Sequence, residues 1–259
     1  MIDAHCHLEH MDADDVVSEA KKKGMTAVVT SIADIADKEK IIEMKKKYQD
    51  FVYICLGFHP EIMNKYSDSD IEEYIDFIRK NKDYISAVGE VGLDYTWITK
   101  TEDQEKSKEI FVKFIHLSKE LGLPLVIHSR NGRDNKDGNN DGIGDAIKIL
   151  SEMECDKVMM HCFSGSESQL KTCIAQGWMI SLATVLVKSF KHQRLAKIVP
   201  LDQLVLETDS PWLDPDSHEL ANRPWKIERS AEVLSGVLGM PKEGILEQTA
   251  ENAKRFFGI

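Results

Sequence analysis

The sequence Ile2-Asp3-Ala4-His5-Cys6-His7 is the stretch from which the fold is worked out. It is a short apolar run that ends in two histidines one residue apart. In a β-strand, residues i and i+2 point to the same face, so His5 and His7 present two imidazoles side by side. Such a pair suits a divalent metal ion. A lone His-x-His pattern is weak, so the rest of the chain decides whether further ligands end later strands.

Apolar, strand-like runs recur after the first one and alternate with segments of helical periodicity. The further runs lie at 25–31, 51–57, 85–90, 123–128, 157–161, 178–182 and 203–209. Helices are predicted at 12–23, 38–48, 69–80, 102–121, 144–154, 167–176, 190–198, 224–238 and 242–257. Eight repeats in 259 residues predict an α/β protein with one domain over residues 1–259, a closed (β/α)8 TIM barrel. A doubly wound open sheet is the alternative, but no Gly-rich dinucleotide loop follows the first run.

Composition places the chain among soluble globular proteins, with 42% hydrophobic and 30% charged residues. No apolar run approaches the roughly 20 residues that span a bilayer, and no basic segment followed by an apolar stretch opens the chain. We therefore expect a cytoplasmic protein with no membrane partner. The sequence leaves the oligomeric state open, with a monomer favoured.

The five cysteines include no Cys-x-x-Cys pair, which favours reduced and mostly buried thiols over a disulfide framework. Cys6 and Cys162 adjoin histidines at the ends of apolar runs. Neighbouring residues of a strand point to opposite faces, so neither thiol is expected to be a metal ligand.

The net charge of −11 argues against binding nucleic acid through a broad basic surface, because counterion release needs Lys and Arg on phosphates. A cleft that contains metal ions could still take a few phosphates, since the ions supply the missing positive charge.

A potential metal ligand or polar contact stands at the end of six of the eight apolar runs. These residues are His5, His7, His59, Glu90, His128, His161 and Asp209. Barrel enzymes build their sites at the carboxyl ends of the strands, where residues scattered along the sequence meet. All of these except His59 are taken as metal ligands, and four histidines with two carboxylates are too many for one tetrahedral ion. They suit two divalent ions (zinc, magnesium or manganese), with Glu90 as the expected bridge and with a water activated for hydrolysis of a phosphodiester or an amide.

The segment 131–145 is rich in Asn, Asp and Gly and is predicted to be an inserted flexible loop. A calcium loop is the alternative, because carboxylates at short spacing around Gly138 can wrap a hard cation. Its candidate ligands are Asp134, Asp137, Asn139 and Asp141. The segment lacks the bidentate Glu that an EF-hand needs at position twelve.

Six short motifs stand in order along almost the whole chain. They are Asp3-Ala4-His5-Cys6-His7, Gly57-Phe58-His59-Pro60, Gly89-Glu90-Val91-Gly92-Leu93-Asp94-Tyr95, His128-Ser129-Arg130, His161-Cys162-Phe163-Ser164-Gly165 and Glu207-Thr208-Asp209-Ser210-Pro211-Trp212-Leu213. Together they make the sequence resemble the TatD-type metal-dependent deoxyribonucleases of the amidohydrolase superfamily.

This resemblance implies a barrel with a two-metal centre that hydrolyses DNA, often as a 3′-to-5′ exonuclease on single strands. It implies one ion held by His5, His7, Glu90 and Asp209, and another held by Glu90, His128 and His161.

The resemblance also implies roles beyond metal binding. Asp209 would orient the attacking water or accept its proton, with Glu90 as the second catalytic carboxylate. His59 and Arg130 would contact phosphate, because the guanidinium fork matches phosphate oxygens. Some relatives instead remove D-amino acids from tRNA, so the resemblance leaves the substrate open.

The sequence departs from the family pattern where substrate contacts are expected. The usual Asn-Glu-Pro appears as Asn222-Arg223-Pro224, Thr96 replaces a second aromatic residue, and the segment 131–145 is long. Arg223 either adds a phosphate contact or is a solvated surface residue.

Three alternatives to a deoxyribonuclease remain at the level of sequence. A D-aminoacyl-tRNA deacylase or a small-molecule amidohydrolase or lactonase would use the same ions, although Glu90 replaces the carboxylated lysine that often bridges such metals. A binding protein with structural zinc held through histidines, Cys6 and Cys162 would unfold on chelation.

Overall fold

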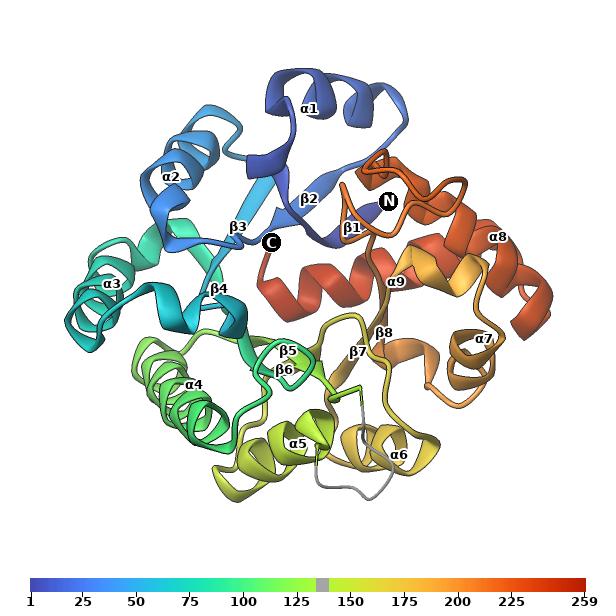
Figure 1. Cartoon of the computed structure of the whole chain (residues 1–259). Helices are drawn as coiled ribbons and strands as arrows, with labels where there is room; N and C mark the ends of the chain where they lie inside the picture. The colour runs from blue at the N-terminus through green and yellow to red at the C-terminus, as the bar shows by residue number, and fades with distance from the viewer. Residues whose placement is uncertain (134–139) are drawn as a thin grey trace.

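The computed structural model describes residues 1–133 and 140–259, and eight parallel strands follow one another through this part of the chain. The strands surround a common centre, helices α1 to α8 form a ring outside them, and α9 runs in toward the centre (Figure 1). The strands are β1 (Ile2–Cys6), β2 (Ala27–Thr30), β3 (Val52–Leu56), β4 (Ile85–Asp94), β5 (Leu125–Arg130), β6 (Val158–Met160), β7 (Met179–Leu182) and β8 (Leu204–Leu206). Each strand pairs with the next along the chain, which confirms the predicted (β/α)8 barrel.

The helices alternate with the strands, and α8 and α9 both follow β8. They are α1 (Ala13–Lys22), α2 (Lys38–Lys47), α3 (Asp68–Lys80), α4 (Thr101–Leu121), α5 (Gly142–Glu152), α6 (Glu167–Ala175), α7 (Phe190–Ala196), α8 (Ile227–Leu238) and α9 (Lys242–Phe257). Short 3-10 helices also occur in the connections, and the sequence did not predict them. No helix in the two described ranges is long and apolar enough to cross a membrane.

Backbone hydrogen bonds join the end of β1 to the segment that follows β8. His7 N donates to Ser210 O at 2.8 Å, and Asp209 N donates to His5 O at 3.0 Å. The buried Asp3 side chain strengthens this seam, because its Oδ1 accepts from Thr208 N at 2.9 Å. The first and last motifs of the sequence therefore lie side by side at the carboxyl end of the barrel.

Three element boundaries differ from prediction for local reasons. β4 continues four residues past Glu90, because its end pairs with β5, with Asp94 opposite Arg130. β8 has only three residues, and Asp209 beyond it has a positive φ of 56°. α5 begins at Gly142, where Asp141 Oδ1 caps the helix by accepting from Gly144 N at 3.0 Å.

The start of α5 shortens the predicted inserted loop, because residues 142–145 are helical. Asp141 serves as the helix cap and also accepts from Gln169 Nε2 at 2.9 Å. The other candidate calcium ligands, Asp134, Asp137 and Asn139, lie outside the described residues.

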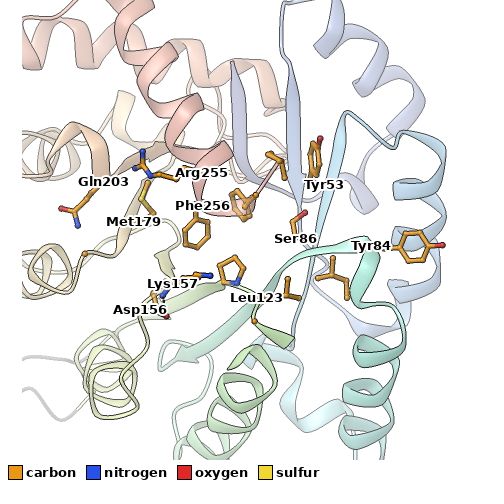
Figure 2. Close-up of a pocket in the computed structure, with 18 of the residues that line it drawn as sticks. Tyr53, Tyr84, Ser86, Leu123, Asp156, Lys157, Met179, Gln203, Arg255 and Phe256 are labelled. Atoms are coloured by element: carbon orange, nitrogen blue, oxygen red, sulfur yellow. Dashed lines mark hydrogen bonds between the residues drawn. The ribbon is translucent and has the colours of Figure 1, made fainter. Parts of the chain in front are cut away.

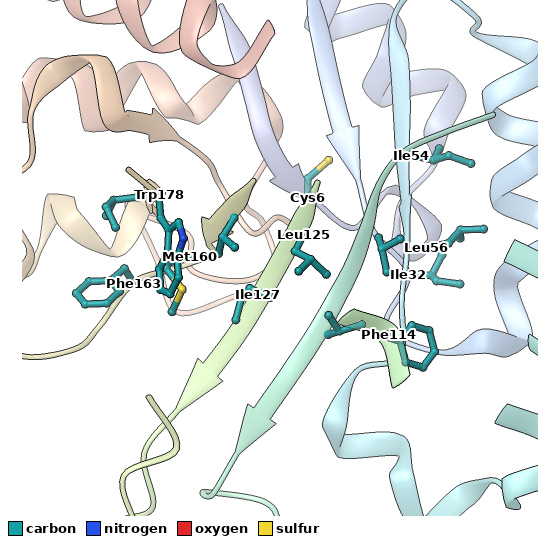
Figure 3. Close-up of a cluster of buried hydrophobic side chains, with 14 of the residues drawn as sticks. Cys6, Ile32, Ile54, Leu56, Phe114, Leu125, Ile127, Met160, Phe163 and Trp178 are labelled. Atoms are coloured by element: carbon teal, nitrogen blue, oxygen red, sulfur yellow. The ribbon is translucent and has the colours of Figure 1, made fainter. Parts of the chain in front are cut away.

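Buried apolar side chains form two clusters. The larger cluster lies between the strands and the helices and includes Ile245 of α9. Figure 3 shows part of it around β5, with Leu125, Ile127 and Phe114 among its members. The second cluster joins strand residues to α9 through Ala250, Ala253 and Phe257.

Helix α4 shows how the sequence produces this packing. Ile110, Phe114 and Leu117 recur at helical spacing and are all buried. The Phe114 ring stacks on Phe58, which follows β3, with the ring centroids 6.1 Å apart. The helix ends at Gly122, whose φ of +67° favours glycine.

Truncation of this buried ring should destabilise the fold strongly. We expect Phe114→Ala to lower the free energy of unfolding by about 3–5 kcal/mol, through lost burial and the cavity left behind. Phe190→Ala, at a side chain that is 81% exposed, should change it by less than about 0.5 kcal/mol. Urea denaturation followed by circular dichroism measures both, and equal effects of the two variants would contradict the core assignment.

Candidate metal centre

The seven residues singled out in the sequence all lie at the carboxyl ends of the strands. His5 is in β1 and His7 follows it, and their Nε2 atoms lie 3.1 Å apart, so the imidazoles are adjacent as predicted. Glu90 is in β4 and His128 in β5, whereas His59, His161 and Asp209 follow β3, β6 and β8.

Glu90 lies at the centre of the histidines, and its two carboxylate oxygens face different ones. Oε2 lies 3.4 Å from His5 Nε2 and 3.7 Å from His7 Nε2. Oε1 lies 2.7 Å from His128 Nδ1 and 3.4 Å from His161 Nε2. Each oxygen of the carboxylate thus faces a separate pair of histidines.

Glycines beside Glu90 allow β4 to approach its neighbours closely. A Cβ atom on Gly89 would lie 2.6 Å from the Val126 side chain, and one on Gly92 would lie 1.9 Å from His128 O. Gly92 also has a φ of +146°, which other residues rarely adopt. The glycines of the Gly-Glu-Val-Gly motif therefore let Glu90 and His128 meet.

Asp209 completes the group from the opposite side of the barrel. Its Oδ1 lies 3.5 Å from His7 Nε2 and 3.8 Å from His5 Nε2. Its side chain is 19% exposed, whereas that of Glu90 is 3% exposed. Asp209 therefore faces the mouth of the site, and Glu90 forms its floor.

Donor atoms that could hold a cation gather in overlapping clusters within 4.8 Å. The clusters are His5, His161 and Asp209; His5, His7 and Glu90; and His59, Glu90 and His128. Imidazole and carboxylate ligands at this spacing fit divalent ions such as zinc, manganese or magnesium. All six predicted metal ligands are in these clusters, and His59 joins them.

Three further carboxylates orient the imidazoles from behind, and the sequence reasoning did not single them out. The contacts are Glu9 Oε1 to His7 Nδ1 at 3.1 Å, Asp94 Oδ2 to His128 Nε2 at 2.9 Å and Glu207 Oε2 to His161 Nδ1 at 3.0 Å. Each contact occupies one ring nitrogen and leaves the other facing Glu90, as is common for metal-binding histidines. All three acids stand within or beside the motifs, but sequence spacing alone does not pair them with a ring.

Cys162 lies closer to the site than the strand pattern predicted. The strand alternation on which its exclusion as a ligand was based does not apply here, because β6 ends at Met160 and Cys162 has a φ of 44°. Its thiol lies in a donor cluster with His161 and Glu207. Cys6, in contrast, donates to Val29 O at 3.4 Å and is part of the buried apolar cluster.

The charges of the site oppose the effect of burial on several groups. Burial alone would raise the pKa of Glu90, but His161, His59 and His5 lower it well below its usual range. Burial would lower the pKa of His128, but Asp94 and Glu90 raise it to about 10. The pKa of His161 is likewise raised to about 9 by Glu207 and Glu90, against burial.

His59 differs from the other histidines. Burial and the neighbouring His128 lower its pKa to about 3, so the ring is neutral at physiological pH. Its Nδ1 accepts from Glu61 N at 3.2 Å, which places the ring proton on Nε2. Nε2 points into the site, 3.3 Å from His128 Nδ1, and is therefore a hydrogen-bond donor there.

The two arginines predicted to contact substrate have no acidic partner among the described residues. Arg130 is the exposed last residue of β5, two residues after His128. Arg223 is half-buried and donates from Nη1 to Asn222 O at 2.8 Å. Asn222 is buried and donates to Thr208 O and Trp212 O, so this segment holds the loop that carries Asp209.

A cavity of about 940 Å³ lies at the other end of the barrel, at residues that precede the strands. Figure 2 shows its lining, which includes Ser86, Lys157 and Arg255. None of the candidate metal ligands lines it, and in barrels this end serves stability, so it is distinct from the candidate site.

Comparison with known proteins assigns the family. Residues 2–258 match the model of the family described as TatD related DNase. The chain belongs to this family. It is 33% identical to the human protein named deoxyribonuclease TATDN3, covering 99% of this chain and 94% of that one. It is 34% identical to a Methanocaldococcus jannaschii protein named as an uncharacterized metal-dependent hydrolase, over 99% and 96% of the two chains.

Solved structures of TatD proteins share the fold. A TatD homologue from Escherichia coli K12 superposes with a TM-score of 0.87 at 23% identity, covering 100% of this chain and 98% of that chain. A TatD family hydrolase from Entamoeba histolytica superposes with a TM-score of 0.83 at 20% identity, covering 99% and 97%.

Removal of the charge behind His161 should weaken metal binding by this TatD chain. Glu207 Oε1 accepts from Cys162 N at 2.8 Å while Oε2 accepts from His161 Nδ1, so Glu207→Gln must turn an NH₂ group toward one of these donors. We expect a 10- to 100-fold loss of metal affinity, roughly the effect of losing such outer partners. Calorimetric titration of the metal-free protein measures it. Glu247→Gln makes the same charge change at an exposed residue of α9 and should leave the affinity unchanged.

Metal affinity should also rise with pH. Because the pKa values of His128 and His161 are raised to about 10 and about 9, both rings carry protons in the metal-free protein at neutral pH. A cation must displace these protons, so binding tightens as pH increases toward 9. Titrations in buffers of different ionisation enthalpy should show proton release at pH 7.5, and buffer-independent heats would refute this.

Proposed function

We propose that this chain is a metal-dependent hydrolase that cleaves the phosphodiester bonds of DNA. The observation that carries the proposal is the position of Glu90, whose oxygens face His5 and His7 on one side and His128 and His161 on the other. The name of the human relative, a deoxyribonuclease, supports DNA as the substrate.

The donor set fits two divalent ions of zinc, magnesium or manganese. The proposed ligands are His5, His7, Glu90 and Asp209 for one ion and Glu90, His128 and His161 for the other. Ions bound there would lower the pKa of a water molecule and stabilise the attacking and leaving oxygens. The residues behind them, Glu9, Asp94 and Glu207, keep the imidazoles in place.

Asp209 is the proposed general base. Burial would raise its pKa, but the hydrogen bond and charge of His7 lower it below the usual value, so the carboxylate is ionised at neutral pH. It is also the more exposed of the two central carboxylates and faces the mouth of the site. An ionised carboxylate at this place can orient a water molecule and accept its proton.

The proposed phosphate contacts are His59, Arg130 and Arg223. The neutral His59 ring presents an Nε2–H donor to the site, which suits a phosphate oxygen better than a metal ion. Arg130 is exposed beside His128 and has no acidic partner in the described chain, so its guanidinium is available to a phosphate. We further propose a single-stranded DNA substrate shortened from its 3′ end.

Substitution of either central carboxylate should abolish nuclease activity in a folded protein. For Glu90→Ala and Asp209→Asn we expect losses of at least about 10²–10⁴-fold, since the first removes a metal ligand and the second removes the negative charge of a ligand that also serves as base. A time course on a 5′-labelled single-stranded oligonucleotide with magnesium, manganese, zinc or EDTA measures cleavage and its polarity.

Glu247→Gln controls for the change of charge and should cleave like the wild type. Full activity in either site variant would refute the proposed centre. No cleavage by a folded, metal-loaded wild type would favour an aminoacyl-tRNA or small-molecule ester or amide as substrate.

A further inference from the structure

Exposed large apolar side chains gather at the catalytic end of the barrel. In the part of the chain that the structure describes, they are Tyr84, Trp97, Phe190 and Leu220. Trp97 follows β4, Phe190 follows β7 and Leu220 follows β8, so three of the four stand in segments that leave the carboxyl ends of strands. Trp97 is 54% exposed and Phe190 is 81% exposed. Large exposed apolar side chains at one end of a molecule can mark a binding surface.

The backbone of Trp97 is hydrogen-bonded to Asp94, which contacts the candidate metal ligand His128. Trp97 N donates to Asp94 Oδ1 at 3.1 Å, while Asp94 Oδ2 contacts His128 Nε2 at 2.9 Å. The preceding Thr96 donates from Oγ1 to Asn131 O at 2.8 Å, one residue beyond Arg130. The backbone at Trp97 is therefore anchored to Asp94, the partner of His128, and lies next to the segment that follows Arg130.

Phe190 stands on the other side of the centre, beside the segment that begins at His161. It is the first residue of α7, and the next side chain, Lys191, donates from Nζ to Ser164 O. Ser164 lies three residues after His161. The segments that carry Trp97 and Phe190 are thus anchored next to His128 and His161 respectively, and these two imidazoles are 6.2 Å apart between centroids.

Cations without acidic partners accompany the two rings. Arg130 is the last residue of β5, which pairs with β4, the strand before Trp97. Lys188 and Lys191 stand within two residues of Phe190 in the sequence. In the described ranges none of the three forms an ion pair, although the chain carries a net charge of −11. Lys188 donates only to the backbone oxygens of Asp214 and Ser217.

Unpaired cations with exposed aromatic rings are the features that hold single-stranded nucleic acid, because the cations follow the backbone and the bases stack on the rings. We propose that Trp97 and Phe190 are base-stacking residues that grip a single strand on the two sides of the scissile phosphodiester. The proposal rests on the proposed nuclease function and names the residues that would hold its single-stranded substrate. The bases of a duplex are already stacked on one another, so the rings favour single strands.

The test compares Trp97→Ala and Phe190→Ala with the wild type on two 5′-labelled single-stranded substrates of equal length. One is an ordinary oligonucleotide, and the other carries abasic tetrahydrofuran residues throughout. Loss of one stacked base should raise KM for the ordinary substrate about 5- to 150-fold, the range that alanine substitution of stacking residues gives. The change in kcat should be small, and KM for the abasic substrate should stay as in the wild type.

Two further variants separate stacking from a structural role. Trp97→Phe keeps an aromatic face and should recover most of the loss. Tyr84→Ala removes an exposed ring at the other end of the barrel, beside the cavity in Figure 2, and should behave as the wild type on both substrates. An unchanged KM in both alanine variants, or an equal rise on the abasic substrate, would overturn the proposal.

Binding separates this proposal from the proposed hydrolysis. Fluorescence anisotropy of the labelled oligonucleotides with metal-free protein reports affinity without turnover. Wild-type protein that binds the ordinary strand more tightly than the abasic one, but cleaves neither with any metal, would refute the nuclease and leave the stacking residues supported if the alanine variants bind more weakly. Equal affinity for both strands would overturn the stacking proposal, whatever the cleavage.

Discussion

The structure depends on one buried anion, the carboxylate of Glu90. Its side chain is 3% exposed, and a charge removed from water is tolerated only where partners compensate for lost hydration. Five histidines from four different strand ends provide that compensation. The barrel is the scaffold that brings them there, since the carboxyl ends of its parallel strands meet at one end of a closed ring, where residues far apart in the sequence can converge on one carboxylate.

The same anion determines the state of its neighbours. His128 and His161 each lie between Glu90 and an outer acid, Asp94 or Glu207, and this raises their pKa values above that of a free imidazole. In the protein without ions, His128 and His161 thus carry protons where cations would bind. Their positive charges reduce the repulsion among the neighbouring carboxylates. A neutral His59, held by Glu61 N, is the exception, and this suits it to donate to substrate instead.

The fold and the inner ligands could be predicted because both follow from short-range pattern. Eight apolar runs alternating with helices specify the barrel, and polar residues at the ends of those runs must converge once the barrel is accepted. The outer acids could not be predicted, because pairing Glu207 with His161 across 46 positions depends on how β6 and β8 end. The surroundings of Cys162 could not be predicted for a related reason: strand alternation no longer applies two residues beyond β6, where φ is positive.

An acidic protein that binds a polyanion must attract it locally at the site, because its net charge repels the polyanion elsewhere. At −11 the molecule as a whole repels nucleic acid, and a Debye length of about 8 Å at physiological salt confines useful attraction to the immediate surroundings of the site. Cations bound by Glu90 and Asp209 would act at this range, as would Arg130 beside them. Stacking on Trp97 or Phe190 needs no charge at all and is little affected by salt, so it adds affinity without making the rest of the surface basic. Aromatic residues at this end of the barrel would thus let the chain hold a nucleic acid strand that its overall negative charge repels.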